Sequence, residues 1–118
     1  MTSEPIYTLK AEFFKTLGHP ARIQILELLA EGEHSVTELM PKLGLESSHL
    51  SQQLAVLRRA GMVATRKQGN TVIYSMTSKD MAELLHVARA VLTGLLTDQV
   101  GLLKDLQASS RASARTSR

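Results

Sequence analysis

Residues 47–61 of the chain, SSHLSQQLAVLRRAG, combine small hydrogen-bonding side chains with two consecutive arginines. If this segment is a helix, Leu50, Leu54 and Leu57 share one face, because residues three and four apart are neighbours on a helix. On the opposite face, serine and glutamine could hydrogen-bond to base edges, and arginine could contact guanine or phosphate. The same composition is also typical of a helix face that is only solvated. The segment thus suggests a DNA-reading helix, a hypothesis that depends on what surrounds it.

The charge distribution favours an anionic partner for this part of the chain. The 118 residues have a formal net charge of +3, and the excess of basic residues lies in the last eleven positions, 108–118. From Ser47 to Lys79 the chain contains Arg58, Arg59, Arg66, Lys67 and Lys79 and no acidic residue. A basic window in an otherwise neutral domain predicts a surface that binds a polyanion such as nucleic acid.

Apolar periodicity and turn residues predict four helices before the middle of the chain. The first covers residues 7–17, and the second, apolar on more than one side, covers residues 20–30. SVTE at residues 35–38 is a capping box that begins a third helix, and Pro41 should end it by Leu43. A tight glycine-containing turn leads into the fourth helix, from Ser47 or Ser48 to Ala60, so the pair has the layout of a helix-turn-helix.

The remaining segments predict a hairpin and one long helix. Residues 62–67 and 71–76 alternate around Gln68-Gly69-Asn70, which is typical of a β-hairpin. From Asp80 to about Gln107 a helix has an apolar stripe broader than one small domain can cover, so its surplus should face another subunit. We expect residues 1–107 to form one DNA-binding and dimerisation domain and residues 108–118 to be a disordered basic tail. The predicted fold class is mainly α with a β-hairpin wing, a winged helix-turn-helix.

Several other classes of protein are disfavoured. The chain has no cysteine, which removes disulfides and thiolate metal sites. It has no apolar run of the ~20 residues that span a bilayer and no leader-like start, so we expect a cytoplasmic protein without a membrane partner. No nucleophile with a base, glycine-rich phosphate loop or paired-carboxylate site is visible, so we expect neither an enzyme nor a cofactor.

Three segments in this order resemble one family. FFKTLGHPARIQILELL, SVTELMPKLGLESSHLSQQLAVLRRAGMV and RKQGNTVIYSM are similar to the ArsR/SmtB family of dimeric bacterial repressors over residues 7 to about 105. The resemblance implies a homodimeric repressor whose fourth helix enters the major groove at an inverted-repeat operator near its own promoter. It also implies that the first and last helices form the dimer. This chain departs from the family at Gln53, where a histidine is common.

The resemblance and the polar faces together select the candidate site residues. The candidates for DNA contact are Ser47, Ser48, His49, Ser51, Gln52, Gln53, Arg59, Arg66, Lys67 and Asn70. The candidates for the dimer interface are Leu9, Phe13, Leu85, Leu92, Leu95 and Leu96. For Arg66 and Lys67 an ordinary surface charge is an equally good interpretation, and His19 and His34 are interpreted as junction and loop residues.

The signal that such a regulator would sense is open. One family site uses cysteines on the third helix, all absent here, and another uses carboxylate and histidine pairs on the last helix. Asp80, Glu83 and His86 lie on the last helix, but no second pair follows, so no metal site is assigned. An unidentified small-molecule effector remains open. The alternative functions are a winged-helix module that binds an acidic protein surface and a metal-responsive repressor with a non-cysteine site.

Overall fold

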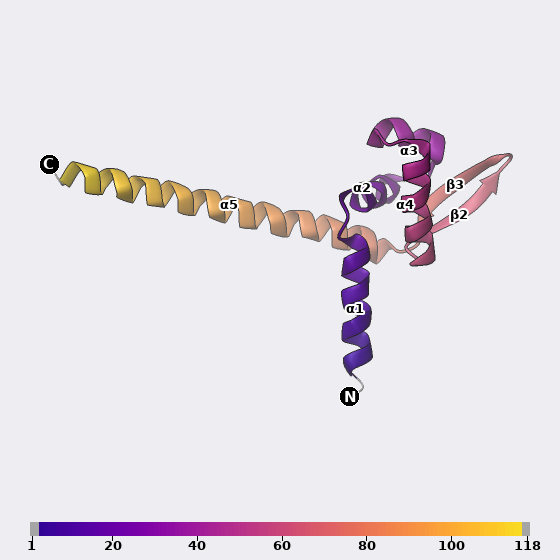
Figure 1. Ribbon diagram of the computed structural model, residues 1–118, viewed down its shortest axis with the longest axis horizontal. Helices are drawn as coiled ribbons and strands as arrows, with labels where there is room; N and C mark the ends of the chain where they lie inside the picture. The colour runs from indigo at the N-terminus through magenta and orange to yellow at the C-terminus, as the bar shows by residue number, and fades with distance from the viewer. Residues whose placement is uncertain (1–2, 117–118) are drawn as a thin grey trace. The chain divides into compact units, whose positions relative to one another are not determined.

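The computed structural model describes the backbone of residues 3–116 and the side chains of residues 5–108 (Figure 1). The chain divides into two compact units, Met1–Glu83 and Leu84–Arg118. The predicted fold class is confirmed, since the protein is mainly helical with a small antiparallel sheet and has the element order of a winged helix-turn-helix. The elements are α1 (Ser3–Leu17), α2 (Pro20–Glu31), β1 (His34–Ser35), α3 (Val36–Leu43), α4 (Ser47–Arg59), β2 (Val63–Gln68), β3 (Thr71–Met76) and α5 (Lys79–Thr116).

The junction between α1 and α2 follows from local chemistry. His19 is the N-cap of α2, and its Nδ1 accepts a hydrogen bond from the backbone N–H of Ala21 at 3.2 Å. Pro20 occupies the first turn, where the missing N–H would have no intrahelical partner. The interpretation of His19 as a junction residue is confirmed.

The helix-turn-helix is held by a cap at one end of α3 and a glycine at the other. The Ser35 hydroxyl accepts from the Glu38 N–H at 3.2 Å, and the Glu38 carboxylate accepts from the Ser35 N–H at 3.0 Å, which confirms the capping box. The bond from the Ser35 N–H holds the pKa of the Glu38 carboxyl below its usual range. Despite the internal Pro41, α3 reaches Leu43, the predicted end. Gly44 then turns the chain with φ 66°, which favours glycine.

The core of the first unit lies among α2, α3 and α4. The largest fully buried side chains come from these three helices: Ile25, Leu26, Leu39, Leu50, Leu54 and Leu57. The leucines of α4 therefore point inward, as their spacing predicts, and the other face of this helix is left to solvent.

The sheet has three strands, in the order β1-β3-β2. The predicted hairpin is present, with Gly69 at φ 65° in the turn, and its tip projects away from the helices (Figure 1). The third strand, β1, was not predicted, and His34 is a strand residue and not a loop residue. It pairs with Tyr74, while Ser35 pairs with Ile73. The sequence did not indicate β1, because a strand of two residues is too short to show an alternating pattern.

Helix α5 is longer than expected. It continues to Thr116, whereas the sequence predicted an end near Gln107. Residues 108–116 contain no glycine or proline that would stop a helix, which accounts for the difference. The expected disordered tail falls partly on residues 117 and 118, which lie outside the described residues. Within residues 3–116, no helix has the length and apolarity needed to cross a membrane.

Candidate nucleic-acid interface

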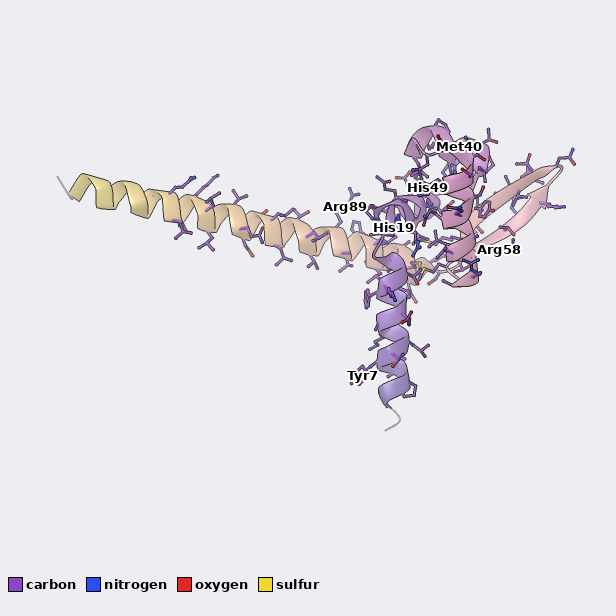
Figure 2. All side chains as sticks on the ribbon, in the orientation of Figure 1. Tyr7, His19, Met40, His49, Arg58 and Arg89 are labelled. Atoms are coloured by element: carbon purple, nitrogen blue, oxygen red, sulfur yellow. The ribbon has the colours of Figure 1, made fainter. Side chains whose placement is uncertain are left out.

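Helix α4 has two chemically different faces. Its buried stripe consists of Leu50, Gln53, Leu54 and Leu57. All but one of the candidate DNA-contacting residues of this helix lie on the exposed remainder: Ser47, Ser48, His49, Ser51, Gln52 and Arg59. Figure 2 labels His49 toward the start of α4 and Arg58 toward its end. The structure thus gathers hydroxyl, imidazole, amide and guanidinium groups on one exposed helix surface.

Gln53 is the exception and corrects the sequence-based choice. Its side chain is only 9% exposed, and its Oε1 accepts a hydrogen bond of 2.8 Å from Nε of Arg22 on α2. Gln53 therefore faces the interior and is not part of the exposed surface of α4. Its position three residues after Leu50 was a signal for burial, but the position was selected through the family resemblance.

Arg22 is a structurally important residue that the sequence analysis did not select. Besides its bond to Gln53, its Nη1 donates to the backbone carbonyl of Thr16, near the end of α1, at 3.2 Å. One guanidinium group thus joins three helices. The available signal was a single basic residue within the otherwise largely apolar segment RIQILELL.

The wing presents two basic residues in different environments. Lys67 is exposed, as is Asn70 in the turn. Arg66 is also exposed, but its Nε lies 2.8 Å from Oε2 of Glu33, and its Nη1 donates to Oε1 of Gln68 at 3.0 Å. Glu33 lies outside the segment Ser47–Lys79 that contains no acidic residue, but in the folded protein it pairs with one of the basic residues of that segment.

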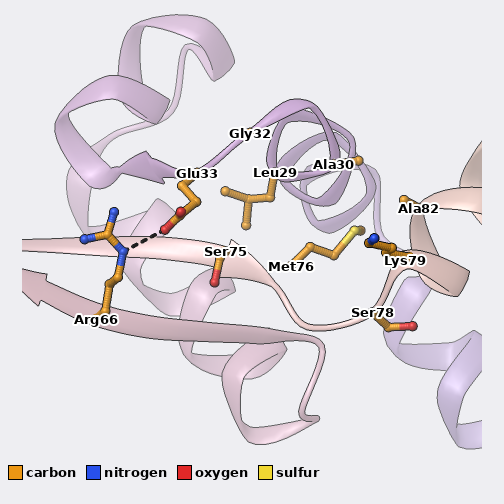
Figure 3. A pocket seen from close by; sticks show the side chains of 10 residues that line it. All are labelled: Leu29, Ala30, Gly32, Glu33, Arg66, Ser75, Met76, Ser78, Lys79 and Ala82. Carbon is orange, nitrogen blue, oxygen red and sulfur yellow. Dashed lines mark hydrogen bonds and ion pairs between the residues drawn. The ribbon is translucent and has the colours of Figure 1, made fainter.

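Behind the wing lies an open groove of about 420 Å³, which the Glu33–Arg66 ion pair borders (Figure 3). Its lining comes from the end of α2 and the two residues after it, both wing strands, and the start of α5 with the residue before it: Leu29, Ala30, Gly32, Glu33, Arg66, Ser75, Met76, Ser78, Lys79 and Ala82. The groove combines apolar, hydroxyl and charged groups.

The candidate dimer residues lie on surfaces of α1 and α5. On α1, Leu9 is 64% exposed, and Phe13 is half-buried with its ring edge-to-face against Phe14. On α5, Leu85 is half-buried, whereas Leu92, Leu95 and Leu96 are more than half exposed. Other large apolar residues of α5 are exposed as well: Val87, Val91, Val100, Leu102, Leu103 and Leu106.

The acidic and histidine side chains do not converge on a metal site in the part of the chain that the structure describes. Asp80, Glu83 and His86 are exposed along α5. His34 is more enclosed than His86, and its Nδ1 lies 3.9 Å from Oε2 of Glu38 beside the capping box.

Comparison with known proteins places this arrangement in a family. Residues 19–65 match the family described as bacterial regulatory protein, arsR family. The chain is 63% identical over 113 residues to the uncharacterized HTH-type transcriptional regulator Rv0081 of Mycobacterium tuberculosis, covering 95% of this chain and 99% of that protein. The crystal structure of Rv0081 superposes with a TM-score of 0.77 and 66% identity over 83% of this chain and 99% of that one.

Two further relatives have named regulatory roles. The biofilm growth-associated repressor of Agrobacterium fabrum is 43% identical over 69% of each chain. The transcriptional activator HlyU of Vibrio cholerae is 49% identical over 61% of this chain and 69% of that protein. These matches are to transcriptional regulators, and the matched family is not a family of enzymes.

Proposed function

The chain belongs to the ArsR family of bacterial transcriptional regulators, and from this we propose that it is a homodimeric repressor that binds an inverted-repeat operator near its own promoter. The observation that supports DNA reading is the exposed face of α4. Its hydrogen-bonding side chains stand on a helix whose opposite face is anchored by fully buried leucines. A helix fixed in this way can present base-reading groups in the major groove without reorganising.

The proposed contacts fall into two chemical classes. Ser47, Ser48, His49, Ser51 and Gln52 are the candidates for base edges and nearby phosphates. Arg59, at the end of α4, and Lys67, Arg66 and Asn70, on the wing, are candidates for the DNA backbone or for guanine. Gln53 is removed from this set because it is buried.

Exposed apolar surface supports the homodimer. Leu92, Leu95 and Leu96 on α5, and Leu9 on α1, would be covered in a dimer that uses both helices. Monomeric soluble proteins rarely leave so many large apolar side chains of one helix open to solvent as α5 does. A two-fold dimer places its recognition helices about 34 Å apart, one turn of DNA, and so predicts an operator that is an inverted repeat.

The other parts of the proposal follow from the family. A bacterial regulator of transcription acts on the chromosome, so we expect the protein in the cytoplasm. We assign residues 1–107 to DNA binding and dimerisation. Repression, as opposed to activation, rests on the similarity to the biofilm growth-associated repressor and is the part that a promoter fusion must decide.

The test is the binding of DNA from upstream of the chain's own gene by the protein and its Gln52→Ala variant. We expect the variant to lose about 1–3 kcal/mol on the operator while its binding to random DNA is unchanged, because one base-reading group is removed. Fluorescence anisotropy at physiological salt measures both affinities. Gln24→Ala, at an exposed glutamine on α2, is the matched control and should bind both DNAs as the unmodified protein does.

Three results would contradict the proposal. Equal losses of affinity for operator and random DNA in Gln52→Ala would mean that α4 contacts the DNA backbone and does not read the base sequence. No specific DNA binding by a protein that is still a dimer would favour the protein-interaction module. Increased expression from a promoter fusion in the presence of the protein would make it an activator.

A further inference from the structure

We propose that Arg22 is a positioning residue that fixes the recognition helix relative to α1 and thereby sets the half-site spacing that the dimer accepts. This inference rests on the proposed function, because it presumes that α4 reads DNA and that α1 contributes to the dimer. It concerns neither a DNA contact nor an apolar interface residue. It assigns a role to a polar bridge beneath the reading surface.

The bridge is defined by two hydrogen bonds from one rigid group. Nε of Arg22 donates to Gln53 at 2.8 Å, and Nη1 donates to the carbonyl of Thr16 at 3.2 Å. The guanidinium is planar, so its two bonds are fixed in direction relative to each other. Because Thr16 lies in the last turn of α1 and Gln53 in the middle of α4, the group holds these two helices at a defined offset.

An apolar residue at position 53 would pack the core without this bridge. Residue 53 falls within the stripe that Leu50, Leu54 and Leu57 form, and a leucine there would complete it. Leucine contacts have little directional preference and tolerate small slides of one helix over another, whereas a hydrogen bond weakens when its distance and angle leave a limited range. The bridge therefore specifies the position of α4 beyond what burial requires.

The position of α4 matters because Gln52, the proposed base-reading residue, immediately precedes Gln53 on the same helix. Any rotation or slide of α4 at Gln53 moves Gln52 and the serines with it. At the other end of the bridge, α1 has the exposed Leu9 that we assign to the dimer. Arg22 thus lies on the path that determines where each recognition helix stands relative to the dimer axis.

Because DNA is helical, the position of each recognition helix determines which half-site spacing the dimer binds best. Each added base pair between half-sites displaces them by about 3.4 Å and rotates them by about 35°. A dimer with rigidly placed recognition helices binds one spacing best. A dimer whose α4 can slide accepts neighbouring spacings more evenly.

The experiment measures the affinities for operators whose half-site spacing is unchanged, shortened by one base pair or lengthened by one. It compares the unmodified protein with Arg22→Met, Gln53→Leu, the double variant and Gln53→Glu. The double variant replaces both hydrogen-bonded side chains, the half-buried Arg22 and the buried Gln53, by apolar groups, a change that can be nearly neutral for stability, and removes the donor only from the Thr16 carbonyl. Gln53→Glu retains an acceptor for the guanidinium.

We expect the double variant to remain a folded dimer and to lose roughly three- to tenfold in its discrimination between spacings, the equivalent of one net hydrogen bond. Gln53→Glu should discriminate as the unmodified protein does. Sedimentation and thermal unfolding establish the dimer and the fold of each variant. Because the readout is a ratio of affinities, a uniform change in DNA binding does not affect it.

Two outcomes would overturn the inference. One is a double variant that discriminates spacings as the unmodified protein does, which would make any defect of the single variants a consequence of an unpaired buried group. The other is loss of discrimination in Gln53→Glu together with the double variant. Failure of the proposed function looks different, since the unmodified protein itself would then bind no operator of any spacing.

Discussion

Large apolar residues are buried in α2, α3 and α4 of the first unit and mostly exposed on α5 of the second. In Met1–Glu83, large side chains from α2, α3 and α4 are fully buried against one another, and the polar side chains of α4 other than Gln53 face solvent. In Leu84–Arg118, α5 has leucines and valines that remain about half exposed or more, Leu95 at 53% among them.

The buried residues of the first unit therefore stabilise its fold, whereas the exposed residues of the second unit are available for assembly with another chain. The first unit contains a core of its own, and its stability should depend on the packing of that core. The apolar residues of the second unit contribute little while exposed, and they become stabilising when a second surface covers them. Mutations in the core of the first unit should therefore lower the free energy of unfolding, and mutations on the exposed face of α5 should weaken dimerisation.

The largest expected effect is on assembly. Leu95→Glu places a charge within the apolar surface of α5, where burial of an unpaired carboxylate is unfavourable, so we expect monomers. Operator affinity should fall by roughly 10²- to 10⁴-fold, because the two half-sites are no longer bound by one molecule. Analytical ultracentrifugation and anisotropy measure these changes. Thr97→Glu, on the opposite side of the helix, should leave the dimer intact, and an undisturbed dimer in Leu95→Glu would place the interface elsewhere.

The second effect is on folding. Leu54→Ala leaves a cavity in the core of the first unit, so we expect the free energy of unfolding to fall by about 2–5 kcal/mol. Denaturant titration measures it, with Ser51→Ala on the exposed side of the same helix as the control, expected to change stability by less than about 0.5 kcal/mol. The loss should be the same at low and high protein concentration. A loss that disappears at high concentration would mean that the two units are not separable in this way.

The smallest effect is on the wing and distinguishes two neighbouring cations. If Lys67 contacts phosphate, Lys67→Gln should weaken binding to operator and random DNA alike and reduce the slope of log affinity against log salt by roughly one for each half-site. Arg66→Gln should change the slope less, because Glu33 already pairs with Arg66. Glu33→Gln is the complementary variant and should steepen the slope. Equal slopes in all the proteins would show that the wing does not touch DNA.

Local chemistry made much of the fold predictable from the sequence. The capping box at Ser35 and Glu38, the glycine turn at Gly44 and the hairpin glycine at Gly69 are each defined by residues within a few positions of one another. Such features depend on backbone geometry that a short segment determines by itself. The helix-turn-helix was predictable for the same reason.

What the sequence did not indicate depends on distant partners. The burial of Gln53 was not predicted, because its hydrogen-bond partner, Arg22, lies 31 residues earlier in the chain. The ion pair of Arg66 was not predicted either, because Glu33 lies 33 residues earlier in the chain. In both cases the residue type was read correctly as hydrogen-bonding or charged, and only tertiary packing decided whether the partner is another side chain or solvent.

The exposed leucines of α5 also have a consequence for gene dosage. If the dimer is the form that binds the operator, then below its dissociation constant the amount of dimer rises with the square of the amount of chain made. Halving expression then leaves about one quarter of the dimer, since assembly follows mass action. A regulator that binds near its own promoter would in this way respond more steeply to its own abundance than a monomer could.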